Sequence, residues 1–316
     1  APTYAKSNSH GEFVFDWAWA DAFHRNGLQY YPKLLTGIPY SPISGPRLLV
    51  RADREDASHL KSMLVDYALS LCREKGYSSW HCNFVIEDDY SPLAQQPLLR
   101  RRDWQFHWRN KEYGCFDDFL ADLRSRKRKS IRRERRQVQQ AGIQVQWKSG
   151  LEIDDADLDF VYDCYIGTFH NYGNYPALKK RFFEIIGQEL GEGFQIALAS
   201  RDEQHVAAAV FLAGGGRLYG RYWGCMEDVP GLHFELAYYQ GIDFCIRNGL
   251  QVFESGAQGE HKSARGFLPT RTRSFHHIEH PGFRQAIDEH LQREKSWLDE
   301  DRHQLDALSP FRRDDT

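Results

Sequence analysis

The chain has 316 residues, of which 41% are hydrophobic, 27% charged and 14% aromatic, a composition that excludes a disordered, collagenous or coiled-coil protein. Its longest apolar runs, such as Ala207–Ala213, are far shorter than the ~20 residues of a membrane-spanning helix. The length corresponds to two domains or one large one. The six cysteines are widely spaced and form no Cys-x-x-Cys pair. Because no signal peptide opens the chain, we expect a protein of the reducing cytoplasm.

The charge is unevenly distributed along the chain. The net charge is -3, but Arg124–Arg136 holds nine basic residues and one Glu. The remainder therefore has 32 basic and 43 acidic residues, from totals of 41 and 44, which leaves a charge of -11. A basic segment on an acidic body predicts one local anionic partner.

Helix and strand patterns alternate through the first half. Apolar residues on helical faces between Tyr4 and Leu28 predict a buried helix that ends at Gly27. An amphipathic helix is predicted at Ala57–Lys75. Strands are predicted at Tyr30–Pro39, Arg47–Val50, Ser79–Val85 and Trp104–Arg109.

One long helix is predicted to carry the whole basic run. Asp117 and Asp118 suit the positive N-terminal end of a helix, and Gly142 is a typical helix end. Only a thin apolar seam follows this helix, which is typical of a helix that bridges two domains.

The second half predicts a mixed arrangement of strands and helices. Strands are predicted at Ile143–Trp147, Gln195–Ser200, Val206–Ala213, Arg217–Gly224, Gln251–Glu254 and Arg273–His280. Helices are predicted at Ala156–Phe169, Ala177–Leu190, His233–Asn248 and Phe283–Leu308. Two helices, three strands, a helix and a strand are the element order of GNAT-type acyltransferases, and the first half could be a second copy.

We therefore predict an α/β (α+β) protein with tandem GNAT-type acyltransferase folds joined by a long basic helix. The predicted parts are a first GNAT-like domain (1–115), a basic connecting helix (116–142), a second GNAT-like domain (143–282) and a peripheral C-terminal helix and tail (283–316). Because the chain begins at Ala1 rather than Met, the first domain could extend upstream.

Several segments carry a resemblance to a known family. They are Asp16–Asp21, the basic run Arg126–Arg135, Tyr219–Cys225, Phe253–Lys262 and Ala264–Pro269. These segments resemble the bacterial FemAB-like family of predicted N-acyltransferases, within the GNAT superfamily. The resemblance extends from about Tyr4 to Arg312 and implies an acyltransferase.

The chain is also distantly similar to the Fem ligases of cell-wall synthesis, which transfer an aminoacyl group from charged tRNA to an amine of a peptidoglycan precursor. Tyr40–Pro46 resembles their Tyr-x-Pro-x-Gly-Pro turn, with Ser44 where Arg is usual. Lys262 with Arg265–Phe267 is similar to their Phe-Lys-x-Gly-Phe loop, with His261 in place of the Phe.

Acyl transfer to an amine needs a base for the amine proton and donors for the oxyanion of the tetrahedral intermediate. In the Gly-rich segment we expect Lys262 to be the oxyanion donor, and Glu254, Glu260 and His261 to be the candidate bases. Each of these residues could instead form a structural salt bridge.

Other candidates would bind the substrates. Arg265 and Gly266 belong to the same Gly-rich segment as Lys262. Arg221 and Trp223 lie on the strand before the helix at His233, where GNAT enzymes hold the acyl donor, although Trp223 could equally belong to the core. Two further cations, Lys33 and Arg47, flank the Pro-Gly turn and are candidates for binding an anionic acceptor.

The distribution of charge along the sequence favours tRNA over acyl-CoA as the carrier of the acyl group. Glu227 and Asp228 precede the helix at His233, where the diphosphate of acyl-CoA would dock, and this disfavours acyl-CoA. A charged tRNA suits the basic helix better. Its candidate contacts are Arg124, Arg126, Lys127, Arg128, Lys129, Arg132, Arg133, Arg135 and Arg136. The alternative is a structural helix whose cations balance the acidic body.

The sequence thus predicts an N-acyltransferase that moves an acyl or aminoacyl group to an amine. Charge favours aminoacyl-tRNA as the donor, and the resemblance to the Fem ligases implies a cell-wall precursor as the acceptor, although the residues themselves do not identify the acceptor. Two alternatives stay open. One is an enzyme that uses acyl-CoA or acyl carrier protein, and the other is a non-catalytic protein that recognises RNA or peptidoglycan. No metal site is predicted.

Overall fold

The computed structural model describes residues 1–171, 173–256, 260–307 and 309–312, without the side chains of residues 260, 261, 301–304, 306 and 307. The chain forms two compact units, each made from two segments. Unit 1 is Ala1–Gln105 with Thr270–Leu305, and unit 2 is Phe106–Pro269 with Asp306–Thr316. The predicted domain boundaries, 1–115 and 143–282, stay a prediction.

Unit 1 is a sheet with helices on both faces. Its strands are β1 (Thr3–Lys6), β2 (Lys33–Thr36), β3 (Ser79–Cys82), β10 (Leu268–Ile278) and β4 (Leu99–Arg109), in that spatial order, and the last two continue into unit 2. Its helices are α1 (Trp17–Arg25), α2 (Ala57–Glu74), η1 (Glu87–Asp89), α3 (Tyr90–Ala94) and α10 (Pro281–Ala307). Strands β2 and β3 are parallel, whereas β1 with β2 and β3 with β10 are antiparallel.

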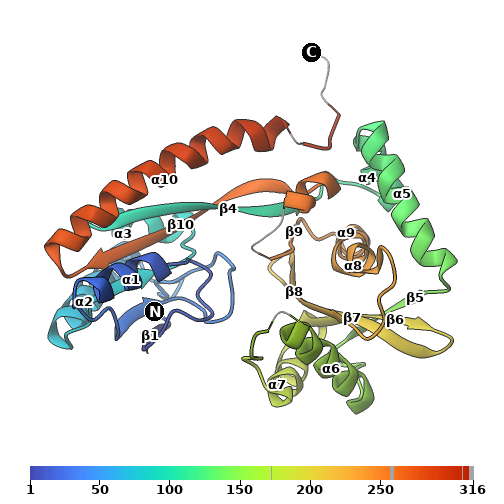
Figure 1. Cartoon of the computed structure of the whole chain (residues 1–316), viewed down its shortest axis with the longest axis horizontal. Coiled ribbons are helices and arrows are strands. Elements are labelled where there is room, and N and C mark those ends of the chain that lie inside the picture. The colour runs from blue at the N-terminus through green and yellow to red at the C-terminus, as the bar shows by residue number, and fades with distance from the viewer. Residues whose placement is uncertain (172, 257–259, 308, 313–316) are drawn as a thin grey trace. The chain divides into compact units, whose positions relative to one another are not determined.

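Successive side chains of each strand point to opposite faces of the unit 1 sheet, so each face packs its own hydrophobic core. On one face, α2 and α3 cover Trp80 and Phe275, and on the other, α1 and α10 enclose Trp19 and Ile278. Figure 1 shows α10 lying along β10 and β4.

Two predictions for unit 1 were wrong. The predicted helix from Tyr4 to Leu28 is shorter, because Thr3–Lys6 forms strand β1 against β2 and the helix begins only at Trp17. Segment Arg47–Val50 is not a strand, since the backbone N–H groups of Arg47 and Leu48 donate to the Asp89 carboxylate instead of a ladder.

Unit 2 contains the predicted antiparallel meander. Its sheet order is β4, β9 (Val252–Glu254), β8 (Arg217–Cys225), β7 (Gln204–Gly214), β6 (Phe194–Arg201) and β5 (Gln144–Ser149). Its helices are α4 (Phe116–Asp122), α5 (Ser125–Gln140), α6 (Asp155–Asn171), α7 (Lys180–Leu190), η2 (Gly191–Gly193), α8 (Leu232–Phe234), η3 (Glu235–Tyr239), α9 (Gln240–Arg247) and η4 (Glu260–Arg265). Only β8 with β9 is a parallel pair.

The two faces of the unit 2 sheet carry different helices. Helices α6 and α7 bury Phe183 and Ile196 on one face, and α6 lies so close that a Cβ on Gly224 would be 2.2 Å from the Cys164 carbonyl oxygen. On the other face, α9 packs through the stacked rings of Trp147 and Phe244, whose centroids are 4.4 Å apart. Strand β8 thus lies between α6 on one face and α9 on the other.

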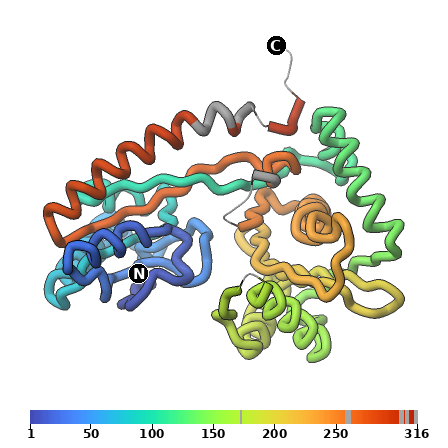
Figure 2. Tube along the Cα trace, in the orientation of Figure 1, coloured from blue at the N-terminus to red at the C-terminus, as the bar shows by residue number. Residues whose placement is uncertain are grey.

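The single helix predicted over residues 116–142 is two helices, α4 and α5, and the basic run lies in α5, with Arg124 at its N-cap. Between α4 and α5 the backbone of Leu123 is extended and forms a bridge with Phe311, and the Arg124 N–H donates to the Pro310 carbonyl. These contacts end α4, and the trace turns before α5 begins (Figure 2). In the part of the chain that the structure describes, no helix combines the length and the apolar character that crossing a membrane requires.

Candidate active site

A row of polar side chains crosses three strands of unit 2. His107 on β4 pairs in register with Glu254 on β9, which pairs with Tyr219 on β8. Residues in register point to the same face of a sheet. The neighbours that point to the other face, such as Trp108 and Phe253, are buried apolar residues. The alternation therefore separates a polar row from the apolar core.

Glu254, a predicted base, is the last residue of β9 and is buried. Its Oε1 accepts a hydrogen bond from the Arg217 guanidinium at 2.7 Å. Its Oε2 is buried without a hydrogen-bond partner in the described chain. Burial raises the pKa of this carboxyl, and Arg217 and Arg109 only partly offset the effect. A carboxylate with a raised pKa and an unused oxygen is suited to accept a proton.

His107 is the nearest titratable neighbour of that free oxygen. Its Nε2 lies 3.6 Å from Glu254 Oε2. Burial lowers the pKa of His107 to about 3, and the cations Arg109, Arg217 and Lys262 add to the effect. The imidazole is therefore neutral at physiological pH. His107 was not among the predicted site residues, because its position in the site depends on a cross-strand register that no local motif reveals.

Lys262, the predicted oxyanion donor, is buried in η4. Its Nζ donates to the carbonyl of Gly256 at 2.7 Å, and no carboxylate forms an ion pair with it among the described residues. Burial lowers the pKa of Lys262 to about 8. Because an ammonium has three N–H donors, two remain for other acceptors.

The rest of the Gly-rich segment supports the fold. Arg265 is buried, stacks on the Phe234 ring, and donates to the Tyr239 hydroxyl at 2.9 Å and to Glu134 at 3.0 Å. Gly266 has a φ of +96°, and a Cβ there would be 2.8 Å from the Phe119 ring. These contacts hold both residues in the interior of unit 2. The Glu260 and His261 side chains lie outside the described residues.

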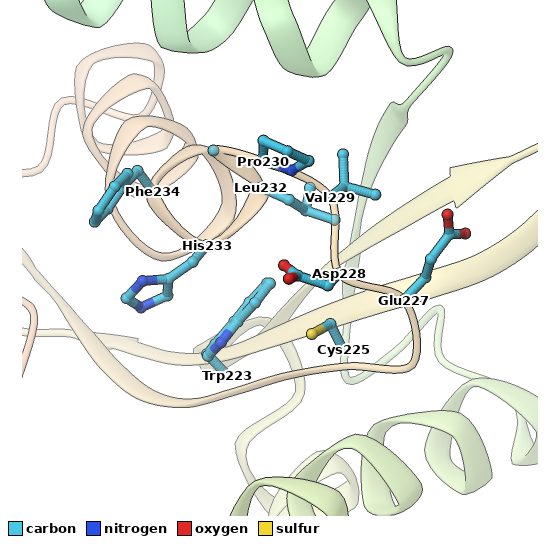
Figure 3. A pocket seen from close by; sticks show the side chains of 10 residues that line it. Trp223, Cys225, Glu227, Asp228, Val229, Pro230, Leu232, His233 and Phe234 are labelled. Carbon is cyan, nitrogen blue, oxygen red and sulfur yellow. The ribbon is translucent and has the colours of Figure 1, made fainter.

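The segment before α8 forms a separate small cavity of about 110 Å³ (Figure 3). Trp223 lines it and packs against His233, with ring centroids 5.1 Å apart. Glu227, at one end of the lining, pairs with Arg201, and Asp228 lies closer to Trp223 (Figure 3). A carboxylate thus lies just before α8, and the preference against a diphosphate donor stays a prediction.

Arg221 shares β8 with Trp223 but is not brought into the polar row. It lies over the Tyr222 ring at 5.4 Å. Strand β8 pairs with β9 only over Arg217–Tyr219, and a Cβ on Gly220 would already touch Phe253 and Ser255. Arg221 and Trp223 thus lie beyond the last position paired with β9, whereas Arg217 of this strand donates to the Glu254 carboxylate and Tyr219 pairs with Glu254 in register.

Lys33 is fully buried in unit 1, in a network of its own. Its ammonium pairs with Glu12 at 2.8 Å and with Asp16, and it donates to the Ser9 hydroxyl. Burial raises the pKa of Glu12. For Asp16, the attraction of Lys33 and several hydrogen bonds outweigh burial and lower the pKa. Lys33 therefore supports the fold of unit 1, and its carboxylates leave no charge for an anionic acceptor.

Arg47 is also buried in unit 1. Its guanidinium donates to the carbonyl oxygens of Asn83 at 2.8 Å and Ile43 at 2.6 Å. Burial lowers the pKa of this guanidinium. Arg47 closes the Pro-Gly turn from inside, so the structure supports a structural role for it.

The basic residues of α5 divide into two groups. Arg132 pairs with Asp117 and Arg135 with Glu235, at 2.9 and 3.1 Å, and Arg124 donates to the Phe311 carbonyl. Arg128 donates weakly to Ser125 of its own helix and to the Ala121 carbonyl of α4, and Lys127 is half-buried. The other four are exposed and have no hydrogen bond or ion pair with any described residue. They are Arg126, Lys129, Arg133 and Arg136, called the basic stripe below.

The basic stripe has helical spacing. Its members are three, four and three residues apart, so they lie on one side of α5. Ile131 and Val138 anchor the opposite side in the core, and Glu134 contacts Tyr239 and Arg265. The helix is thus fixed to unit 2 with four unpaired cations on its outer side. Among the described residues, no group of three or more His, Cys, Asp or Glu is placed to hold a metal ion.

These features fit a known family. The FemAB-like family model, described as peptidoglycan biosynthesis/recognition, matches residues 1–313. The chain therefore belongs to the FemAB-like family, which makes it a peptidoglycan-related transferase. No curated protein sequence matches the chain.

Solved structures with little sequence identity share the fold. L-PGS from Bacillus licheniformis matches with a TM-score of 0.55 and 10% identity, over 83% of each chain. The C-terminal domain of a putative lysylphosphatidylglycerol synthetase from Agrobacterium fabrum matches with a TM-score of 0.52 and 13% identity, over 74% of this chain and 77% of that one. FemX matches with a TM-score of 0.52 and 11% identity, over 81% and 84%. The predicted α/β fold class is confirmed.

Proposed function

We propose that the protein is an N-acyltransferase that moves an aminoacyl group from charged tRNA to an amine of a cell-wall precursor. One observation carries this proposal. Near the end of β9, unit 2 holds a buried cation and a buried carboxylate that are not paired with each other. Their complementary roles are those that acyl transfer to an amine requires.

In this proposal Glu254 is the base and Lys262 is the hydrogen-bond donor to the oxyanion. The amine nitrogen forms a bond to the acyl carbon, and the bond from that carbon to the ester oxygen of the donor breaks. Glu254 accepts the proton that the nitrogen loses and later releases it to solvent. The departing alkoxide takes one proton from solvent and leaves as a hydroxyl. While the intermediate carries its charge, the two unused N–H donors of Lys262 stabilise the oxyanion, and one such donor is typically worth about 3 to 4 kcal/mol.

The basic stripe supports tRNA as the donor. A row of cations on one helix can follow a phosphate backbone without reading sequence. The stripe has no carboxylate partner in the described chain, so its charge is available to an external anion. The carboxylate of Asp228 at the cavity before α8 argues against the diphosphate of acyl-CoA.

The experiment that tests this proposal compares several acyl donors with the same set of amine acceptors. Pure protein is incubated with labelled aminoacyl-tRNA, acyl-CoA or acyl carrier protein, together with amine-bearing cell-wall precursors, and every new labelled amide is identified by mass spectrometry. We expect an amide only with aminoacyl-tRNA. Transfer from acyl-CoA alone would overturn the assignment of the donor. Salt-sensitive tRNA binding without transfer from any donor would identify a recognition protein instead.

A further inference from the structure

A second row of side chains lies beside the row that holds Glu254. Arg109 on β4 and Arg217 on β8 both pair in register with Val252 of β9. Because Val252 precedes Glu254 by two residues, both arginines project from the same face of the sheet as Glu254. The arginines therefore stand on the two strands that flank β9, about 7 Å along the strands from the candidate base.

The two arginines differ in what they contact. Arg217 donates to Glu254 Oε1 at 2.7 Å. Arg109 is exposed and forms no hydrogen bond or ion pair with any residue that the structure describes. Since the base engages only one of the two arginines, the guanidinium of the other is available to a ligand.

Positive charge exceeds negative charge around the candidate base. Besides burial, the charges that act on the pKa of His107 are those of Arg109, Arg217 and Lys262. Within the described chain, Glu254 is the only carboxylate that forms an ion pair with any of these three cations. A group of three cations with one carboxylate attracts a ligand that brings a negative charge.

Exposure shows the side from which such a ligand arrives. The side chain of Arg217 is 41% exposed, whereas those of Glu254 and His107 are each 6% exposed. An amine that reaches Glu254 from this open side carries its neighbouring atoms past the arginines. An amine nitrogen and a carboxylate oxygen on one carbon are roughly 3 Å apart. With a charge-assisted hydrogen bond of about 2.8 Å at each end, such a group spans two neighbouring rows.

We propose that the acceptor carries a carboxylate on the carbon that bears its amine, and that Arg109 binds this carboxylate while the amine faces Glu254. This inference rests on the proposed function, which makes Glu254 the base. A guanidinium binds a carboxylate through two parallel N–H donors, so the contact also holds the amine in one orientation. The acceptor is thus an amino carboxylate rather than a simple alkylamine.

Binding without any acyl donor tests this inference separately from transfer. The probes are lysine and lysinamide, which have the same two amines and differ in one carboxylate or neutral amide. NMR titration of the wild type is expected to give a dissociation constant at least about tenfold lower for lysine. In Arg109→Met the affinity for lysine should fall to that for lysinamide. The melting temperature should stay the same, because Arg109 is exposed.

The matched control is Arg247→Met, which removes an exposed arginine of α9 and should keep the wild-type preference for lysine. Equal affinity of the wild type for the two probes would overturn the proposal. So would a wild type that does not bind lysine, or a preference that survives in Arg109→Met.

Inorganic phosphate is the third probe, because a phosphate group could also pair with an arginine. If phosphate displaces lysine and binds more tightly, and if Arg109→Met removes this binding, the arginine serves a phosphate and the proposal is wrong. A preference for lysine that depends on Arg109, without transfer from any donor, would support the amino carboxylate site and contradict the proposed transfer.

Discussion

Two buried lysines show how neighbouring charges decide the role of a side chain. Lys33 has two carboxylates and a hydroxyl around its ammonium. Lys262 has a single carbonyl partner in the described chain, and burial lowers its pKa to about 8. A cation that is desolvated and not neutralised costs stability and is often kept for function.

Replacing Lys262 should therefore reduce activity without reducing stability. Lys262→Met is expected to lower turnover by about two orders of magnitude through loss of the oxyanion donor. It also removes a desolvation cost of about 3 kcal/mol, on the order of the pKa shift, against the loss of one hydrogen bond of about 1 kcal/mol. The melting temperature should not fall. A large drop in thermal stability would show that Lys262 is a structural residue.

The pH dependence of the rate follows from the same two groups. Glu254 must be ionised, so the rate should rise as pH passes its raised pKa. Lys262 must be protonated, so the rate should fall above pH about 8. In Lys262→Arg the guanidinium stays charged, and the alkaline fall should disappear from the activity that remains. An unchanged alkaline limb in this variant would assign that pKa to another group.

Lys33 gives the contrasting case. Lys33→Met would leave Glu12 and Asp16 buried without their cation. Removing one partner of a buried ion pair typically costs about 3 to 5 kcal/mol. We expect a loss of this size in urea unfolding, with Lys6→Met, which changes a more exposed partner of Glu12, as the mild control. Equal stability of the two variants would contradict the structural role.

At the scale of elements, the register of β4, β9 and β8 creates the site. Glu254 and Lys262 could be named from a motif, because both lie in one Gly-rich stretch of sequence. His107 and Arg217 could not, since they reach Glu254 only through strand pairing across long sequence separations. The prediction of one long helix over residues 116–142 was wrong for a similar reason. Asp117 and Gly142 do mark helix ends, but the break at Leu123 depends on Phe311, far away in the chain.

Helix α5 supports a prediction on RNA binding. Changing the basic stripe, Arg126, Lys129, Arg133 and Arg136, to alanine should weaken tRNA binding. The slope of log K against log salt should become shallower by about 3, since each phosphate contact contributes about 0.7 to 0.9. The measurement is fluorescence anisotropy over a salt series.

A matched control separates this effect from net charge. Arg51, Arg54, Arg181 and Arg247 are four exposed but paired arginines on other elements. Their combined change to alanine removes the same charge and should leave the slope nearly unchanged. If both variants changed the slope equally, the basic stripe would have no specific role.

At the scale of the whole molecule, composition and periodicity were sufficient for the α/β class and for the meander of β6, β7 and β8. That part was readable because apolar strands and tight turns are local signals. Strand β1 was missed, since its four residues are mostly exposed and only pairing with β2 defines them. The compact units were also not readable, because each joins two segments that are far apart in the chain.

The most direct test of the central claim is the rate of amide formation from labelled aminoacyl-tRNA and an amine-bearing cell-wall precursor, compared between wild type, Glu254→Gln and Lys262→Met. We predict transfer by the wild type and a rate at least about a hundredfold lower in each variant, with tRNA binding unchanged. Equal rates in the three proteins would contradict the assignment of the site, and absence of transfer by the wild type would contradict the enzyme itself.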